Sequence, residues 1–220
     1  MAGAGIDDPK VARVLAREHE NARGDQDRLA ASRSAINDTL SDGMDARALY
    51  PRDVYLAVKP DMGRFLHLAA LTIGARNIVE FGTSFGVSTI YFAAAARETG
   101  GRVTGSEFEP AKAQKALANL AEAGLDTYVD IRVGDALETL KDIEGPVDLL
   151  FLDGGKNLYV PVLELLRPKL RPGALVLADN IHFPPSRIQL YIDHVNAPGG
   201  PFRSMVLPFE SGLGYSVYCP

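Results

Sequence analysis

A buried strand, a glycine turn and the start of a helix follow one another between residues 78 and 90, and this stretch constrains the fold most. Ile78 and Val79 are typical of a strand that is covered on both faces. Gly82 and Gly86 carry no Cβ, so the backbone can turn sharply there and approach a ligand closely. The helix start offers free backbone N–H groups to whatever lies in the turn. The pattern predicts an α/β sheet with a ligand site outside the carboxyl end of this strand.

Two acidic residues limit the kind of ligand that the glycine turn can bind. Glu80 lies just before the turn, where a buried carboxylate needs a hydrogen-bond donor or a cation. Glu107 closes the next predicted strand, at the position that holds ribose hydroxyls in such folds. A dinucleotide site favours G-x-G-x-x-G, whereas this chain has only Gly82-x-x-x-Gly86 with Ser84 between. An adenosyl ligand with a cationic amino-acid tail fits better than a diphosphate, and a purely structural turn is the alternative.

Strands and helices alternate through the rest of the chain. The patterns predict strands over 76–81, 102–107, 128–133, 147–152 and 174–178, with helices over 87–98, 110–123, 136–140 and 159–170. This alternation predicts parallel strands joined by right-handed crossovers. After a helix over 186–195, two alternating segments, 202–209 and 214–218, predict a hairpin with one antiparallel strand inserted at the sheet edge. The expected fold is a doubly wound, mostly parallel seven-stranded α/β sheet.

The first 59 residues are expected to form a helical extension, a lid or a dimer contact, before a main domain over 60–220. Asp8 and Pro9 read as an N-cap and a first helical residue, followed by a weakly amphipathic helical region over 10–37 that is broken near Gly24. A further helix is predicted from 60 to 73. A pocket-lining role and ordinary packing both remain open for Tyr50, Pro51, Tyr55 and Val58.

Composition limits the class of protein. With 220 residues, 46% of them hydrophobic, the chain can form one domain with a sizeable core. A net charge of -5 argues against a nucleic-acid-binding surface. The single cysteine, Cys219, excludes an internal disulfide framework, and no apolar run approaches the roughly 20 residues that span a bilayer. The N-terminus lacks a basic-then-apolar signal pattern. We therefore expect a soluble cytoplasmic protein that binds neither nucleic acid nor membranes.

Polar residues follow two neighbouring predicted strands. Asp153 ends the fourth strand, and Asp179 with Asn180 ends the fifth. Both strand ends flank the switch region of a doubly wound sheet, so these side chains and the Gly82 turn should share one crevice. Two carboxylates and an amide oxygen predict a divalent-cation site for Mg²⁺ first, with Mn²⁺ or Ca²⁺ as alternatives. The alternative is a turn at Asp153 and a cap at Asp179.

Lys156 follows Asp153 by three residues. A lysine at a cation-lined rim can have a lowered pKa and then accept a proton from a hydroxyl. The alternative is a solvated lysine at a helix start. Asp135 ends the third strand, where it can accept from an adenine amino group, cap the following helix, or do both.

Together these motifs resemble the class I S-adenosylmethionine-dependent O-methyltransferases, and within them the cation-dependent catechol and caffeoyl-CoA type. The resemblance runs from about residue 58 to the C-terminus. It implies a Rossmann-like methyltransferase fold, a small-molecule acceptor and a homodimer. It is carried by the order of the motifs, which are Glu80-Phe-Gly-Thr-Ser-Phe-Gly-Val-Ser88, Glu107, Gly134-Asp-Ala-Leu137, Asp153-Gly-Gly-Lys-Asn-Leu-Tyr159 and Asp179-Asn180.

The resemblance also implies roles for individual residues. Lys156 would be the catalytic base, and the divalent cation would be bound by Asp153, Asp179 and Asn180. The residues implied to bind S-adenosylmethionine are Glu80, Gly82, Ser84, Ser88, Glu107, Phe108, Asp135, Ala136 and Asp153. The chain departs from the family pattern at Gly154-Gly155 and over residues 181–185.

The expected reaction is in-line transfer of the methyl group to a hydroxyl of a catechol-like or phenolic acceptor, assisted by the cation. The first alternative keeps S-adenosylmethionine and drops the metal. A second is an NAD-dependent oxidoreductase on a similar sheet, against which the missing G-x-G-x-x-G speaks. A third is a module that binds the cofactor without catalysis.

Overall fold

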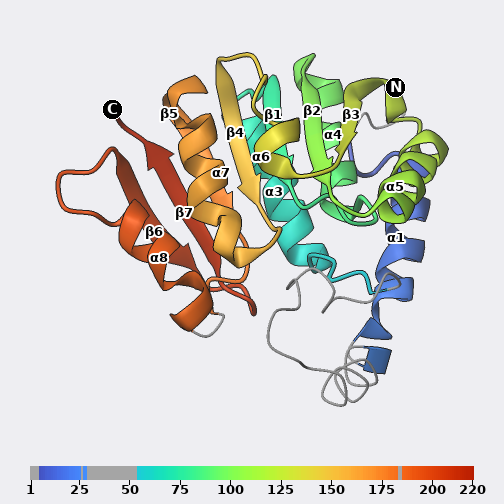
Figure 1. Ribbon diagram of the computed structural model, residues 1–220. Helices are drawn as coiled ribbons and strands as arrows, with labels where there is room; N and C mark the ends of the chain where they lie inside the picture. Colours follow the sequence, from blue (N-terminus) through green and yellow to red (C-terminus); the bar gives the residue numbers. More distant parts are fainter. Residues whose placement is uncertain (1–4, 26, 29–53, 183–184) are drawn as a thin grey trace.

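The computed structural model describes residues 5–25, 27–28, 54–182 and 185–220, the side chains of residues 185–187 excepted. Its centre is a seven-stranded sheet in the order β3-β2-β1-β4-β5-β7-β6 (Figure 1). The strands are β1 (Asn77–Phe81), β2 (Arg102–Glu107), β3 (Val129–Val133), β4 (Val147–Leu152), β5 (Leu170–Ala178), β6 (Phe202–Leu207) and β7 (Leu213–Tyr218). Strands β1 to β5 are parallel, whereas β7 is antiparallel to both β5 and β6. The predicted doubly wound sheet with a C-terminal hairpin is confirmed.

Helices cover both faces of the sheet (Figure 1). One face carries α1 (Pro9–Ala22), α3 (Pro60–Thr72), α4 (Val87–Thr99) and α5 (Pro110–Ala123), and the other carries α6 (Ala136–Thr139), α7 (Tyr159–Leu166) and α8 (Pro185–Val195). Successive strand side chains point to opposite faces, so Ile78 joins the first core and Val79 the second. Of the helices in the described residues, none is long and apolar enough to cross a bilayer.

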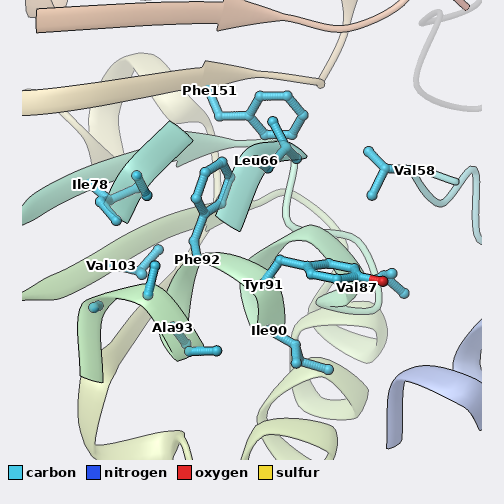
Figure 2. Packing of buried hydrophobic residues seen from close by; sticks show 14 of the residues in the cluster. Val58, Leu66, Ile78, Val87, Ile90, Tyr91, Phe92, Ala93, Val103 and Phe151 are labelled. Carbon is cyan, nitrogen blue, oxygen red and sulfur yellow. The ribbon is translucent and has the colours of Figure 1, made fainter. Parts of the chain in front are cut away.

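Helix α4 is buried on every side. Ala93, Ala94, Ala95 and Ala96 are all fully buried, since α4 lies between the sheet and its neighbouring helices. Phe92 of α4 packs against Phe151 of β4 with ring centroids 5.4 Å apart (Figure 2). This packing fixes where α4 begins, and therefore where the glycine turn before it lies.

Some predicted boundaries were wrong. The helix predicted over 159–170 ends at Leu166, and a 3₁₀ turn, η4 (Arg167–Lys169), follows it. Pro168 lacks a backbone N–H and cannot continue the α-helical ladder. Strand β5 then begins at Leu170 rather than at 174, with a register shift against β4. Tyr128 belongs to the 3₁₀ turn η2 (Asp126–Tyr128) instead of the third strand.

At the N-terminus, Asp8 caps α1 as predicted, accepting a hydrogen bond from Lys10 N at 2.9 Å, and Pro9 is the first helical residue. The helix ends before a turn at residues 23–24, at the predicted break. Tyr50, Pro51 and residues 29–37 of the predicted helical region lie outside the described residues. The division of the chain into an extension over 1–59 and a main domain stays a prediction.

Candidate active site

The turn between β1 and α4 depends on two glycines. Gly82 has φ +98°, and a Cβ built there would lie 2.6 Å from the backbone carbon of Asp153. Only glycine therefore lets the tip of β1 lie directly against the tip of β4. Gly86 has φ +82° and precedes α4, and its Cβ would lie 3.0 Å from the Cβ of Ala116 in α5.

Glu80 is fully buried beneath this turn. Its carboxylate accepts hydrogen bonds from Ser88 Oγ at 2.6 Å, from Thr83 Oγ1 at 3.1 Å, and from Thr89 Oγ1. Burial raises the pKa of Glu80 to about 6, although the three hydroxyl donors favour the charged form. Glu80 thus ties the turn to the first turn of α4, and the Ser88 hydroxyl is directed at Glu80.

Glu107 lies at the end of β2, beside the same turn. Its carboxylate accepts from Ser84 N at 2.7 Å and from Glu109 N at 2.8 Å. Ser84 has φ +49°, and its hydroxyl donates to the carbonyl of Tyr55 at 2.9 Å. Phe108, the next residue along the chain, is half exposed.

Asp135 caps α6 and accepts from Leu137 N at 3.0 Å. The predicted capping role is therefore observed, and Ala136 is buried in the second core. An adenine contact by either residue stays a prediction.

A narrow cleft of about 10 Å³ lies over the Gly82 turn, which is room for about one water molecule. It brings together the predicted site residues Gly82, Ser84, Ser88 and Asp153. Tyr55 and Val58, two of the candidates for a pocket lining, are also in its wall. The full lining is Tyr55, Leu56, Ala57, Val58, Gly82, Thr83, Ser84, Phe85, Val87, Ser88 and Asp153.

The tips of three strands meet at this rim. Asp153 N donates to the carbonyl of Phe81 at 2.8 Å, and Asp179 N donates to the carbonyl of Leu152 at 3.0 Å. These bonds extend the ladders of β1, β4 and β5 by one residue, and they place Gly82, Asp153 and Asp179 side by side.

The two aspartates form a buried pair. Burial raises the pKa of the Asp153 carboxyl, and the charge of Asp179 raises it further. Burial also raises the pKa of Asp179, against hydrogen bonds from Ser211 Oγ and Asn180 N, both at 2.6 Å. Asn180 adopts φ +62°, a conformation that asparagine tolerates better than most residues. Two buried acids thus lie together at the tips of β4 and β5, where burial favours their neutral forms.

Lys156, in the 3₁₀ turn η3 (Lys156–Leu158), reaches this pair. Its Nζ lies 3.4 Å from Asp153 Oδ1 and donates to Tyr159 Oη at 2.6 Å, while Tyr159 Oη donates to the carbonyl of Asp179 at 3.1 Å. Burial lowers the pKa of the Lys156 ammonium, and the two aspartates oppose this effect. A larger cavity of about 590 Å³ adjoins Lys156 between α7 and α8.

The predicted cation ligands fit a hard divalent ion. Asp153, Asp179 and Asn180 supply carboxylate and amide oxygens, which Mg²⁺ prefers over nitrogen or sulfur. Burial is the main cause that raises the pKa of both acids, and the positive charge of Lys156 opposes it. Within the described residues, no group of three or more His, Cys, Asp and Glu side chains is placed to hold a metal ion. The candidate ligand set contains two carboxylates, those of Asp153 and Asp179, and its third oxygen would come from the Asn180 amide.

Several residues at the site were not singled out for a role from the sequence. Thr83 and Thr89 donate to Glu80, and their positions three and nine residues after it were the available signal. Tyr159 had its signal in the Lys156-x-x-Tyr159 spacing. Ser211 reaches Asp179 from the turn between β6 and β7, and no local pattern reveals that contact.

Comparison with known protein families matches residues 79–181 to a family described as "Methyltransferase domain". A catechol O-methyltransferase from Niastella koreensis is 38% identical over 130 residues, covering 57% of this chain and 58% of the relative. A catechol O-methyltransferase from Mycobacterium tuberculosis is 39% identical over 127 residues, covering 57% of each. The chain thus matches somewhat less than three fifths of the length of these curated relatives.

Solved structures extend the similarity over most of the chain. An O-methyltransferase from Bacillus cereus in complex with SAH superposes with a TM-score of 0.69 at 28% identity, covering 84% of this chain and 96% of that one. An O-methyltransferase of tomaymycin synthesis from Streptomyces achromogenes, in complex with SAM, has a TM-score of 0.69 at 26% identity, with 89% and 99% covered.

Proposed function

Because this chain belongs to the class I O-methyltransferases, we propose that it moves a methyl group from S-adenosylmethionine to a hydroxyl of a small catechol-like or phenolic acceptor. The observation that carries the proposal is the meeting of three strand tips. The glycine turn that fits the cofactor lies against Asp153, and Asp153 lies against Lys156 and Asp179. Donor and acceptor would therefore be held within reach of each other.

The cofactor supplies the methyl group as a positively charged sulfonium. Gly82 leaves the backbone accessible, and the Glu107 carboxylate stands at the mouth of the turn, where ribose hydroxyls would donate to it. Glu80 lies beneath the turn, where its fully buried carboxylate accepts hydrogen bonds from three hydroxyl groups. We assign it the role of shaping the turn.

Asp153, Asp179 and Asn180 would hold a divalent cation, for which Mg²⁺ is the first choice. When bound, such an ion lowers the pKa of an acceptor hydroxyl that it contacts. Lys156 would accept the hydroxyl proton at Nζ, which its bond to Tyr159 keeps at the rim. Holding both reactants in line is expected to contribute several kcal/mol of the rate enhancement.

The test is methyl transfer from S-adenosylmethionine to catechol, measured for single variants with and without EDTA. Lys156→Ala and Asp153→Ala should each abolish turnover, because one removes the base and the other a cation ligand. Lys141→Ala is the matched control, since Lys141 is exposed and its Nζ donates to the exposed side chain of Glu138. Full activity of Asp153→Ala in the presence of EDTA would reject the metal role, and full activity of Lys156→Ala would reject the base.

A metal-independent methyltransferase is the second candidate. The Lys156 ammonium already lies 3.4 Å from Asp153 and supplies a positive charge where the cation would bind. Titration of the wild-type enzyme with Mg²⁺ after exhaustive chelation separates the two candidates. Activity that does not depend on Mg²⁺ would favour the second.

We also propose that the protein is a cytoplasmic homodimer, as the resemblance and the single cysteine suggest. Light scattering of the purified chain tests the dimer, and cell fractionation tests the location.

A further inference from the structure

One segment, residues 54–58, borders the cleft over the Gly82 turn. Its residues 55–58 line this cleft together with residues of the turn. The ring of Tyr55 stacks on Phe85 with centroids 4.1 Å apart and an interplanar angle of 22°. The carbonyl of Tyr55 accepts from Ser84 Oγ at 2.9 Å. The 54–58 segment therefore rests directly on the turn that would hold the cofactor.

A single carboxylate fixes the backbone of this segment. Asp25, which follows α1, accepts from Tyr55 N at 3.0 Å with Oδ1 and from Leu56 N at 2.6 Å with Oδ2. Leu56 has φ +51°, a conformation that residues with a side chain rarely adopt. Arg28 also donates to Asp25, at 3.0 Å. The unusual backbone at Leu56 is thus held by two hydrogen bonds to one buried acid.

Helix α1 holds the side chain of Tyr55. Glu18 is fully buried in α1 and accepts from Tyr55 Oη at 2.8 Å. Burial favours its neutral form, but hydrogen bonds from Arg17 and Tyr55 and the charge of Lys115 outweigh burial, so the pKa of Glu18 lies below its ordinary value. Glu18 is therefore an anion at neutral pH, which strengthens the bond that it accepts.

Helix α5 provides the third attachment. Lys112 is buried, and its Nζ donates to the carbonyl of Val54 at 2.8 Å while lying 5.3 Å from the centre of the Phe85 ring. Three buried charged side chains thus converge on five residues. Buried charges are costly unless their hydrogen bonds are satisfied, and each of these three makes a hydrogen bond to residues 54–58.

We infer that Asp25, Glu18 and Lys112 are positioning residues for the cofactor: they hold residues 54–58 against the Gly82 turn, so that cofactor affinity depends on α1 and its C-terminal continuation. Asp25 and Glu18 precede the matched methyltransferase domain, which begins at residue 79. The inference rests on the proposed function, because it assumes that the cleft binds S-adenosylmethionine and its product.

The test compares two conservative variants with a control. In Asp25→Asn one oxygen becomes an NH₂ group, which cannot accept from a backbone N–H. In Tyr55→Phe the bond to Glu18 is lost while the stacking on Phe85 is kept. We expect the calorimetric Kd for S-adenosylhomocysteine to rise about tenfold in each, which corresponds to about 1.4 kcal/mol. The KM for S-adenosylmethionine should rise similarly, with kcat within about twofold of the wild type.

The control is Glu122→Gln. Glu122 links α5 to α1 through Arg17 at 2.5 Å, and among the described residues its hydrogen bond and ion pairs are with Arg17 and Arg13, outside the 54–58 segment. The Kd of the Glu122→Gln variant for S-adenosylhomocysteine should equal that of the wild type. Hydrogen exchange provides a second readout: the Tyr55 and Leu56 amides should exchange faster in Asp25→Asn than in the wild type, while the α1 amides remain unchanged.

Two results would overturn the inference and can be told apart. Wild-type Kd values in both folded variants, with fast exchange at Tyr55 and Leu56, would show that the 54–58 segment does not position the cofactor. Absence of S-adenosylhomocysteine binding by the wild-type protein would reject the proposed function, and the inference with it.

Discussion

At the residue scale, the tip of β1 leaves no space for a side chain at Gly82. Gly82→Ala combines an unfavourable backbone conformation with a Cβ 2.6 Å from the backbone of Asp153. We expect a loss of about 2 kcal/mol or more in unfolding free energy and loss of cofactor binding, because the tip of β4 must move. Denaturant unfolding and calorimetry measure the two effects.

Gly100→Ala is the matched control, because Gly100 has φ +71° and no atom of the described residues that could clash lies within 4 Å of a Cβ built there. This substitution should lower the unfolding free energy by about 1 kcal/mol through backbone strain alone and leave cofactor binding unchanged. Equal effects of the two substitutions would show that the close approach to Asp153 is unimportant.

Glu80 predicts a specific pH dependence of stability. The folded pKa is about 6 and the ordinary value is 4.5, so between these values the native state keeps a proton that the unfolded state releases. Stability is therefore lost as the pH rises from 4.5 to about 6, by about 2 kcal/mol for a shift of this size. Above pH 6 the contribution is constant.

Glu80→Gln isolates that contribution, since glutamine does not titrate. The difference in unfolding free energy between the variant and the wild type should shift by about 2 kcal/mol, in favour of the variant, between pH 4 and pH 7. Urea unfolding at a series of pH values measures it. A difference that is flat across this range would mean that the pKa of Glu80 is not raised.

The candidate site was partly predictable at this scale. Glycines and acids at strand tips have local signals, so Gly82, Asp153 and Asp179 could be named and are found side by side. The direction of a side chain has no such signal. The hydrogen bond that Ser88 Oγ donates to Glu80 had no local signal, and the cofactor contact predicted for Ser88 stays a prediction. Ser211 contacts Asp179 through the tertiary fold alone.

At the scale of elements, helix α4 leaves little space for larger side chains, because its residues 87–96 are buried. It carries apolar residues on all sides, and Figure 2 shows its Phe92 in the same core cluster as Leu66 and Phe151. We expect Ala94→Leu to destabilise the protein by about 1–3 kcal/mol, because the extra atoms have no space in a close-packed core. Thermal and chemical unfolding measure the change.

Ala118→Leu, at an exposed position of α5, is the control and should change stability by no more than about 0.5 kcal/mol. A comparable loss in both variants would indicate that helix propensity, and not core packing, sets the cost.

The bounds of a helix or strand were predicted correctly where the sequence marks its two ends clearly. Helix α5 begins at Pro110 and ends before Gly124, and both of its bounds were predicted. Strand β5 was predicted four residues short, because Pro172 and Gly173 normally interrupt a strand. The pairing of Val147 with Leu170 keeps that segment in the sheet, and only the folded neighbour reveals it.

At the scale of the whole molecule, ligand binding should raise thermal stability. At a concentration of 100 times its Kd, S-adenosylhomocysteine should stabilise the native state by about 2.7 kcal/mol. For a chain of 220 residues this corresponds to a rise in Tm of about 5–10 °C. NAD at the same concentration should give no rise, since the turn lacks the three-glycine pattern. A rise with NAD alone would support the oxidoreductase alternative.

The order of the strands has a consequence for a chain emerging from the ribosome. The last strand in the sequence, β7, lies between β5 and β6, so β6 is joined to the sheet only through Leu213–Tyr218. Until those residues are translated, β6 has no partner and the far border of β5 is uncovered. A stop codon in place of the Leu213 codon would thus remove β7 and leave β6 without the strand that joins it to the sheet.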